Sequence, residues 1–98
     1  MINENSIEKY LIAQCKKAGA MLRKTQWVGH NHCPDRLVMT PHATVWVELK
    51  APGKVPRPGQ YREHDRMRAA GQTVIVIDSK NQVDDFIKTL KGLNNATN

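Results

Sequence analysis

Two carboxylates and an amine stand out in the sequence because their spacing lets them meet on one face of a sheet. Glu48 and Lys50 lie two positions apart at the end of a strand-like run, so both side chains project to the same face. A hairpin that turns symmetrically between Pro41 and His42 pairs Asp35 with Glu48, with their Cβ atoms about 5 Å apart. Because Pro41-His42 is not among the favoured two-residue turns, a register shifted by one or two residues is the alternative.

The chemistry of this trio follows from charge. Two carboxylates at such a distance repel each other unless one takes up a proton or a cation lies between them. Oxygen ligands with few protein donors favour Mg²⁺ or Mn²⁺ over Zn²⁺. A metal held by Asp35 and Glu48 can accept a phosphate oxygen during in-line displacement at phosphorus. Lys50 can then orient the attacking water or stabilise the pentavalent state.

The elements that must position these residues follow from hydrophobic periodicity and turn residues. Asn5 and Glu8 resemble a capping box at the start of the first helix, and Gly19 can end that helix. The order helix, three strands, helix, strand, helix predicts an α/β fold with a mixed sheet flanked by helices. The expected helices are residues 3–18, 60–70 and 84–93, and the expected strands are residues 21–28, 36–39, 44–49 and 73–77. Residues 1–93 then form one domain, and residues 94–98 a frayed tail.

The charge of the chain favours a polyanionic partner such as nucleic acid. Its 98 residues suit a single domain, and 15 Lys and Arg against nine Asp and Glu give a net charge of +6. The segment from Lys50 to Arg68 holds most of the excess. Without a long apolar run or a signal-peptide pattern, we expect a cytoplasmic protein that does not enter membranes. Cys15 and Cys33 then remain thiols.

The motif around the trio resembles that of a known nuclease superfamily. Pro34-Asp35, then twelve residues, then Glu48-Leu49-Lys50 is similar to the PD-(D/E)xK pattern. Within that superfamily the chain resembles the virus-type replication-repair nuclease (VRR-NUC) domain of phage and DNA-repair proteins. The likeness extends through Ala51-Pro52-Gly53-Lys54 and Gln60 to the stretch from Gly71 to Asp78. It implies a restriction-endonuclease-like core and, for a phage protein, the cytoplasm of a bacterial host.

The resemblance also implies further residues of the site. It suggests that the Leu49 carbonyl joins Asp35 and Glu48 at the metal, and that a carboxylate from the first helix assists. Glu8 is our choice for that carboxylate, and Glu4 is the alternative. Gln60 matches a position where the family places an active-site glutamine. DNA contacts are expected from Lys54, Arg57, Arg62, Arg36 and His32.

His32 departs from the family pattern, which commonly has glycine at this position. The departure leaves open the shape of the loop that precedes Asp35. His30, His32 and Cys33 also form a cluster, but its spacing matches no common zinc site, so we expect a loop lining the DNA surface. Trp27 and Trp46 alternate with apolar neighbours, which is more typical of core or interface positions than of base stacking.

Simpler interpretations of the same residues stay open. Glu48 and Lys50 can be an exposed surface pair, and Asp35 can be a turn residue after proline. Glu8 fits a capping box as well as a ligand.

Two functions therefore compete. The first is a Mg²⁺- or Mn²⁺-dependent DNA endonuclease without an organic cofactor that leaves a 5′-phosphate. By resemblance it acts on branched DNA such as Holliday junctions, as a homodimer. The second is a non-catalytic basic DNA-binding module on the same fold.

Overall fold

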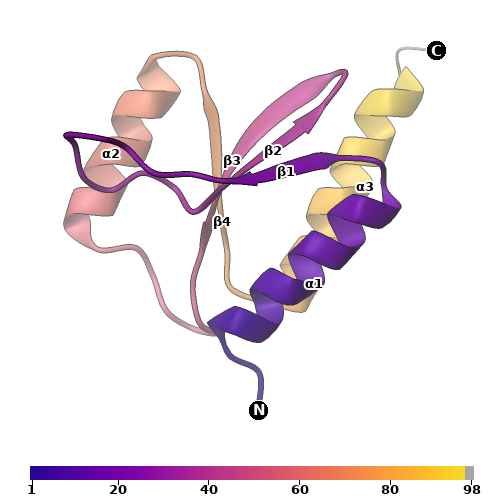
Figure 1. Cartoon of the computed structure of the whole chain (residues 1–98), viewed down its shortest axis with the longest axis horizontal. Helices are drawn as coiled ribbons and strands as arrows, with labels where there is room; N and C mark the ends of the chain where they lie inside the picture. The colour runs from indigo at the N-terminus through magenta and orange to yellow at the C-terminus, as the bar shows by residue number, and fades with distance from the viewer. Residues whose placement is uncertain (97–98) are drawn as a thin grey trace.

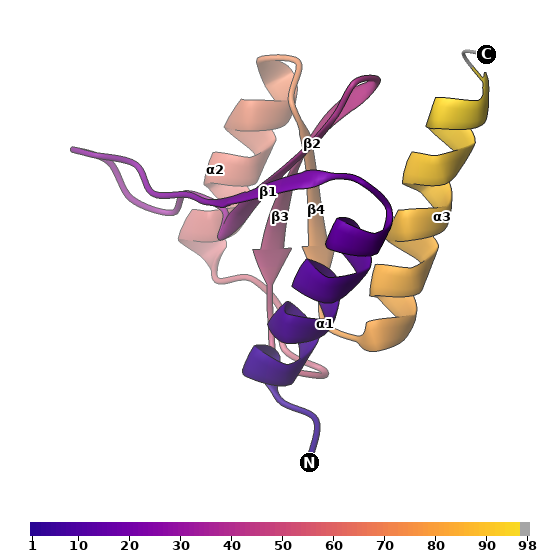
Figure 2. The same cartoon turned by 45° about the vertical axis from the view of Figure 1, so that its right-hand side comes forward.

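A four-stranded sheet forms the centre of the molecule, and three helices cover its two faces (Figure 1). This computed structural model describes residues 1–96. Helices α1 and α3 lie together on one face of the sheet, and α2 lies on the other (Figures 1 and 2). The elements are α1 (Glu4–Lys17), β1 (Met21–Lys24), β2 (Arg36–Thr40), β3 (Ala43–Leu49), α2 (Pro58–Ala69), β4 (Thr73–Ile77) and α3 (Lys80–Ala96).

The sheet is mixed, as the order of the elements predicts. Its strands follow the order β1-β2-β3-β4, in which β1, β2 and β3 pair antiparallel and β3 and β4 pair parallel. Helix α2 makes the crossover that a parallel pair requires. Strand β3 therefore lies inside the sheet, between the hairpin partner β2 and the parallel strand β4.

The hairpin of β2 and β3 has the symmetric register. Arg36 pairs with Val47, and Thr40 pairs with Ala43. The Thr40 hydroxyl oxygen accepts hydrogen bonds from the backbone N–H groups of His42 at 3.2 Å and Ala43 at 3.0 Å. These bonds satisfy the turn amides, which explains how a turn outside the favoured set still holds the expected register.

One face of the sheet forms the hydrophobic core with α1 and α3. Val45, Val47 and Leu49 alternate along β3 and all point into this core, so the residues between them point toward α2. Cys15 is buried in the core from α1, and both it and Cys33 are free thiols. The other main core residues are Ile7, Leu11, Val38, Ile77, Val83, Phe86, Ile87 and Leu90.

Helix α1 has a different N-cap from the expected one. Asn3 is its N-cap: the Asn3 side chain accepts from the Ser6 N–H at 2.9 Å, and the Ser6 hydroxyl accepts from the Asn3 N–H at 3.0 Å. The expected pair of Asn5 and Glu8 is wrong, because Asn5 already lies inside the helix. Glu8 is thus not a capping residue. Gly19 has φ 76°, the left-handed conformation expected after the end of the helix.

Two other elements differ from the prediction by more than two residues at one or both ends, and α2, β2 and β3 differ by one or two. Strand β1 ends at Lys24, because residues 25–35 form a loop with its own hydrogen bonds. Helix α3 begins at Lys80 instead of residue 84, since the Ser79 hydroxyl accepts from the Gln82 N–H at 3.1 Å. It runs to Ala96, so the expected tail is helical over residues 94–96, and residues 97–98 lie outside the described part. None of the helices in residues 1–96 is long and apolar enough to cross a membrane.

Candidate active site

Asp35, Glu48 and Lys50 meet at the end of the hairpin, on the face of the sheet that α2 covers. The register of β2 and β3, continued by one residue pair, places Asp35 opposite Glu48. Asp35 Oδ2 accepts the backbone N–H of Leu49 at 2.7 Å. Lys50 Nζ lies 3.3 Å from Glu48 Oε2. The sequence prediction that the three side chains form one cluster is therefore confirmed as geometry.

Gln60 joins this cluster from the first turn of α2. Its Oε1 accepts from Lys50 Nζ at 2.9 Å and from the Arg57 backbone N–H at 2.8 Å. Its Nε2 donates to Glu48 Oε2 at 3.2 Å. Gln60 is buried, so one side chain fixes the helix N-terminus, the amine and the carboxylate relative to one another. The positive end of the α2 dipole also lies beside this acid.

Glu48 is an acid that the protein leaves short of partners. The residue is only 3% exposed, and within residues 1–96 its Oε1 atom has no hydrogen-bond partner. Burial and the neighbouring Asp35 carboxylate raise the Glu48 pKa to about 7, although Lys50 opposes the rise. A buried, partnerless carboxylate oxygen beside a second carboxylate is the arrangement that a cation would stabilise.

The donors at this position suit a hard divalent cation. Asp35 and Glu48 offer carboxylate oxygens. Leu49, which lies between Glu48 and Lys50 in the chain, offers a backbone carbonyl. Among the described residues, no three His, Cys, Asp or Glu side chains are arranged so that they could hold a metal ion together. A small donor set is compatible with Mg²⁺, which usually keeps several waters and needs one or two carboxylates.

Glu8 lies elsewhere. Its Oε2 accepts from Arg36 Nε at 3.1 Å. Arg36 pairs directly with Val47, so both side chains leave the sheet on the face that α1 covers, opposite to Glu48. In the part of the chain that the structure describes, Glu8 contacts the residue next to Asp35 instead of Asp35 or Glu48. Glu4, the alternative, is the exposed first residue of α1.

The expected DNA-contacting residues fall into two groups. Lys54, Arg57 and Arg62 are exposed on the loop before α2 and on α2 itself, around the buried Gln60. Arg36 is different, because its side chain is only 16% exposed and is held by Glu8. The basic surface near the carboxylates thus comes mainly from α2 and the loop before it.

His32 keeps the backbone shape that glycine would give. Its φ of 70° lies in the left-handed region, where residues other than glycine are uncommon. The imidazole lies against Gly59 in the first turn of α2, where an added Cβ would come within 2.5 Å of His32 Nε2. The missing Cβ of Gly59 makes room for the ring, so the loop before Asp35 packs closely on α2.

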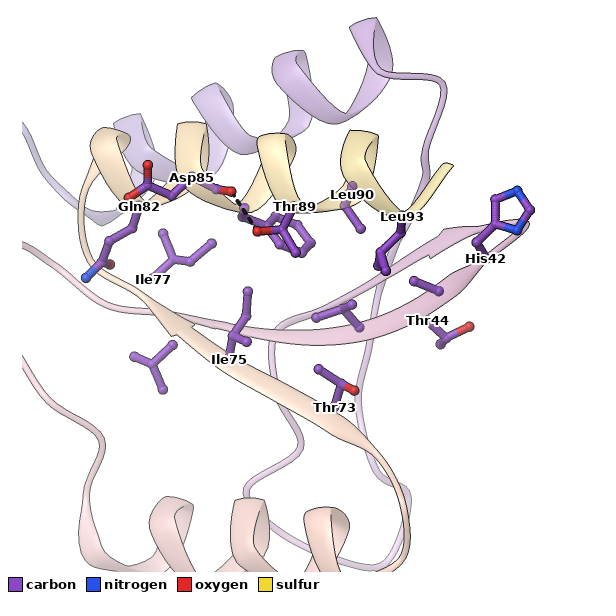
Figure 3. Close-up of a pocket in the computed structure, with 14 residues that line it drawn as sticks. His42, Thr44, Thr73, Ile75, Ile77, Gln82, Asp85, Thr89, Leu90 and Leu93 are labelled. Atoms are coloured by element: carbon purple, nitrogen blue, oxygen red, sulfur yellow. Dashed lines mark hydrogen bonds between the residues drawn. The ribbon is translucent and has the colours of Figure 1, made fainter. Parts of the chain in front are cut away.

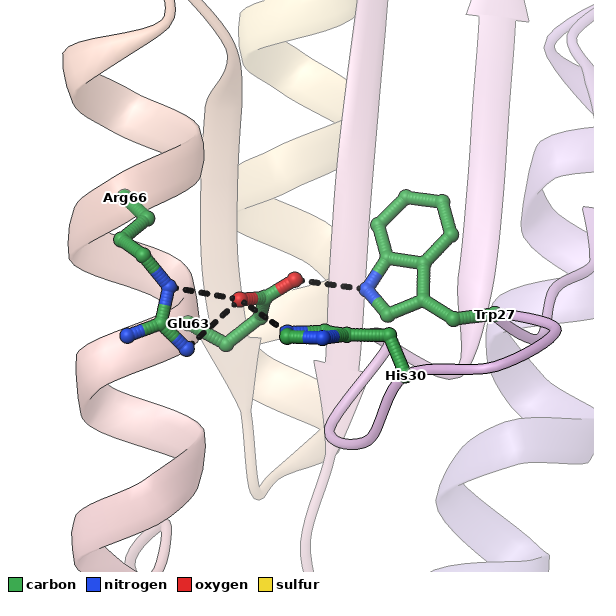
Figure 4. Close-up of polar contacts among 4 residues, drawn as sticks. All are labelled: Trp27, His30, Glu63 and Arg66. Carbon is green, nitrogen blue, oxygen red and sulfur yellow. Dashed lines mark hydrogen bonds and ion pairs between the residues drawn. The ribbon is translucent and has the colours of Figure 1, made fainter.

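Glu63 is an organising residue that the sequence prediction missed. Its carboxylate accepts from Trp27 Nε1 at 2.7 Å, lies 3.2 Å from His30 Nε2, and accepts from Arg66 Nε at 3.0 Å (Figure 4). Burial opposes its ionisation, but the hydrogen bonds from these partners prevail and lower the Glu63 pKa. The available signal was the spacing from Gln60, since residues three apart share a helix face.

A groove of about 560 Å³ opens between α3 and the strands β3 and β4. Figure 3 shows Ile75 and Ile77 facing Leu90 and Leu93 across it. These strand residues point away from α2, so the groove lies on the opposite face from Glu48. It is not part of the carboxylate cluster.

Comparisons with known proteins identify the family of the chain. No family model matches the chain. The chain is 46% identical over 81 residues to "Putative nuclease p44" of Acyrthosiphon pisum secondary endosymbiont phage 1, a match that covers 82% of this chain and 87% of that protein. A solved structure described as a VRR_NUC domain is 34% identical with a TM-score of 0.81, covering 90% of this chain and 97% of that one. The chain therefore belongs to the VRR-NUC family of nuclease domains.

Proposed function

We propose that this nuclease domain is a Mg²⁺- or Mn²⁺-dependent DNA endonuclease whose metal is held by Asp35, Glu48 and the Leu49 carbonyl. The observation that carries the proposal is a buried Glu48 oxygen that lies beside Asp35 and has no hydrogen-bond partner among the residues that the structure describes. An ionised carboxylate buried in this way destabilises the fold unless a cation balances its charge. The lysine and the glutamine at the same point argue further for chemistry on a phosphate.

Each residue of the candidate site has a distinct role in this proposal. The metal would supply charge for the phosphate oxygens and lower the pKa of a water. Glu48 must be deprotonated to act as a ligand, which its raised pKa allows near and above pH 7. The Lys50 ammonium group donates a hydrogen bond to the attacking water or to the phosphate. Gln60 keeps that ammonium group and the Glu48 carboxylate in place.

Glu8 assists this site from α1. Its ion pair with Arg36 fixes the residue directly after Asp35 in the chain. We assign Glu8 this supporting part, and we assign phosphate contacts to Lys54, Arg57 and Arg62, which are exposed around Gln60. Phosphate contacts of this kind set the register of the substrate and make binding depend on salt.

Branched DNA and a homodimer complete the proposal. A four-way junction has two equivalent strands to cut, and a twofold symmetric enzyme supplies two sites in matching orientation. The apolar groove beside Leu90 and Leu93 offers a surface for the second copy, at the β4 edge of the sheet. The resemblance to junction resolvases of phages supports this substrate, and we assign the protein to the cytoplasm of the host cell.

A cleavage panel tests the proposal. Four-way junction, flap, nicked and linear duplex DNA are incubated with the protein and Mg²⁺, Mn²⁺ or EDTA. We expect cleavage with metal only, and a loss of at least about 100-fold in Glu48→Gln and Lys50→Met. The matched control is Asp65→Asn, an exposed acid on α2, which should retain full activity. Full activity in either active-site variant would contradict the assignment.

The binding module remains the rival, and a metal titration separates the two. Calorimetry with Mn²⁺ should give a heat of binding that disappears in Glu48→Gln. A non-catalytic module would bind DNA with a steep dependence on salt and would give no metal heat. A mass measurement in solution checks the dimer separately, because a monomer that cleaves junctions would refute only that part.

A further inference from the structure

The loop of residues 25–35, between β1 and β2, is closed at its base. Thr25 N–H donates to the Asp35 carbonyl at 3.1 Å, and the Thr25 hydroxyl donates to the Pro34 carbonyl at 2.6 Å. The chain then runs out past the end of the sheet and returns, as Figure 2 shows for the segment that leaves β1 beside α2. The two hydrogen bonds from Thr25 tie the base of the loop to Asp35 and the residue before it.

The loop is also held near its tip. Trp27 and His30 both contact the Glu63 carboxylate, at 2.7 and 3.2 Å, from the two sides of the turn (Figure 4). Gly29 has φ 77°, which allows the chain to reverse between them. The Trp27 ring also lies 5.3 Å from the Trp46 ring, centroid to centroid. A single buried acid on α2 thus fixes both flanks of the turn.

Val28 stands at this turn with its side chain in solvent, at 100% relative exposure. A single exposed apolar residue is ordinary on a protein surface. This one differs because its neighbours are anchored, so the exposed side chain is held at a fixed place. The chain also carries no acidic residue from Lys9 to Pro34, which makes the loop acceptable to a polyanion.

We propose that the 25–35 loop is a rigid prong that places Val28 against unstacked bases of the DNA substrate. This inference rests on the proposed function, since it takes DNA as the substrate. An apolar side chain inserted into intact duplex must first unstack a base step, which costs a few kcal/mol. At a branch point the bases are already open, so the same contact is gained without that cost. The prong therefore favours binding of branched DNA over continuous duplex. Because the loop ends at Asp35, this contact would lie near the candidate active site.

The test uses the full-length protein without divalent metal, so that the DNA stays intact. A four-way junction carries 2-aminopurine at the branch point, and a linear duplex carries the same base at a matched step. We expect the wild type to raise the junction fluorescence. Val28→Thr, which keeps the shape and removes the apolar contact, should abolish that rise and weaken junction binding roughly tenfold, with duplex binding unchanged.

Two further variants keep the interpretation sharp. Ile12→Thr makes the same kind of change at an exposed residue of α1 and should bind both DNAs like the wild type. Trp27→Phe keeps an aromatic side chain but removes the indole N–H that donates to Glu63. This variant should lose part of the preference for the junction. Unchanged fluorescence and junction affinity in Val28→Thr would overturn the prong. If the fluorescence rise depended on Val28 but the protein cleaved no DNA with Mg²⁺ or Mn²⁺, only the proposed nuclease chemistry would be refuted.

Discussion

Glu48→Gln should stabilise the metal-free protein at neutral and alkaline pH. The folded protein raises the Glu48 pKa from 4.5 to about 7, so the neutral carboxyl stabilises the fold fully below pH 4.5. That contribution is lost as the pH rises through about 7, because the charged carboxylate is buried beside Asp35. At about 1.4 kcal/mol per pKa unit, the loss amounts to about 3 kcal/mol.

Urea unfolding in EDTA at pH 4.5 and pH 8.5 measures this effect. The stability of the wild type relative to Glu48→Gln should fall by about 3 kcal/mol between the two pH values, a midpoint change of about 2 M urea. Saturating Mn²⁺ at pH 8.5 should remove the deficit of the wild type, because the cation takes the place of the proton. Glutamine cannot ionise, so the variant should gain far less from Mn²⁺.

Glu63→Gln is the matched control, because Glu63 is also a buried acid but has a lowered pKa. Its carboxylate contributes stability above its unfolded pKa, and this is lost as the pH falls through the lowered value. Between pH 4.5 and pH 8.5 the stability of the wild type relative to Glu63→Gln should therefore stay nearly constant, in contrast to the Glu48 result, and it should fall only below pH 4.5. If the wild type and Glu48→Gln kept the same stability difference at both pH values, the account of a strained, cation-seeking carboxylate would be refuted.

Three further predictions follow from the same region. His64 is fully buried, and neither ring nitrogen has a hydrogen-bond partner in residues 1–96. His64→Leu should therefore raise the free energy of unfolding by about 1 kcal/mol in thermal unfolding, and a lower stability of the variant would mean that the ring is hydrogen-bonded. Gly59→Ala should be less favourable in the wild type than in His32→Gly, and a double-mutant cycle of unfolding free energies that shows no coupling would contradict the ring packing. The apparent affinity for Mn²⁺ should rise about tenfold per pH unit up to about pH 7 and then level off, because Glu48 must lose its proton before it binds the metal. Calorimetry that shows the same affinity at every pH would count against Glu48 as a ligand.

The parts of the site that could be predicted from the sequence depend on local periodicity. Alternation along one strand places Glu48 and Lys50 on one face, and a short hairpin with a symmetric turn brings Asp35 opposite Glu48. Gln60 was found from the resemblance to a family motif, and its contacts with Lys50 and Glu48 agree with that position. The first two relations involve one strand and its hairpin partner, so backbone hydrogen-bond geometry determines them, whereas Gln60 rests on the resemblance.

The remaining features depend on packing between distant segments, which no local pattern encodes. Glu8 lies on the opposite face of the sheet because α1 packs there, and Asn3 takes the capping position expected of Asn5. Glu63 binds a loop more than thirty residues away, so its role follows only from the position of α2.

The opening trio shows the same division. The sequence by itself determined that Glu48 and Lys50 share one face of a strand, and it predicted Asp35 opposite Glu48 with a shifted register as the alternative, which the observed pairing excludes. Only the tertiary structure decided that Glu48 is buried and that one of its oxygens has no partner within residues 1–96, since α2 must cover the sheet to exclude water from this side chain. Burial converts a pair of nearby acids into a site that a divalent cation would stabilise.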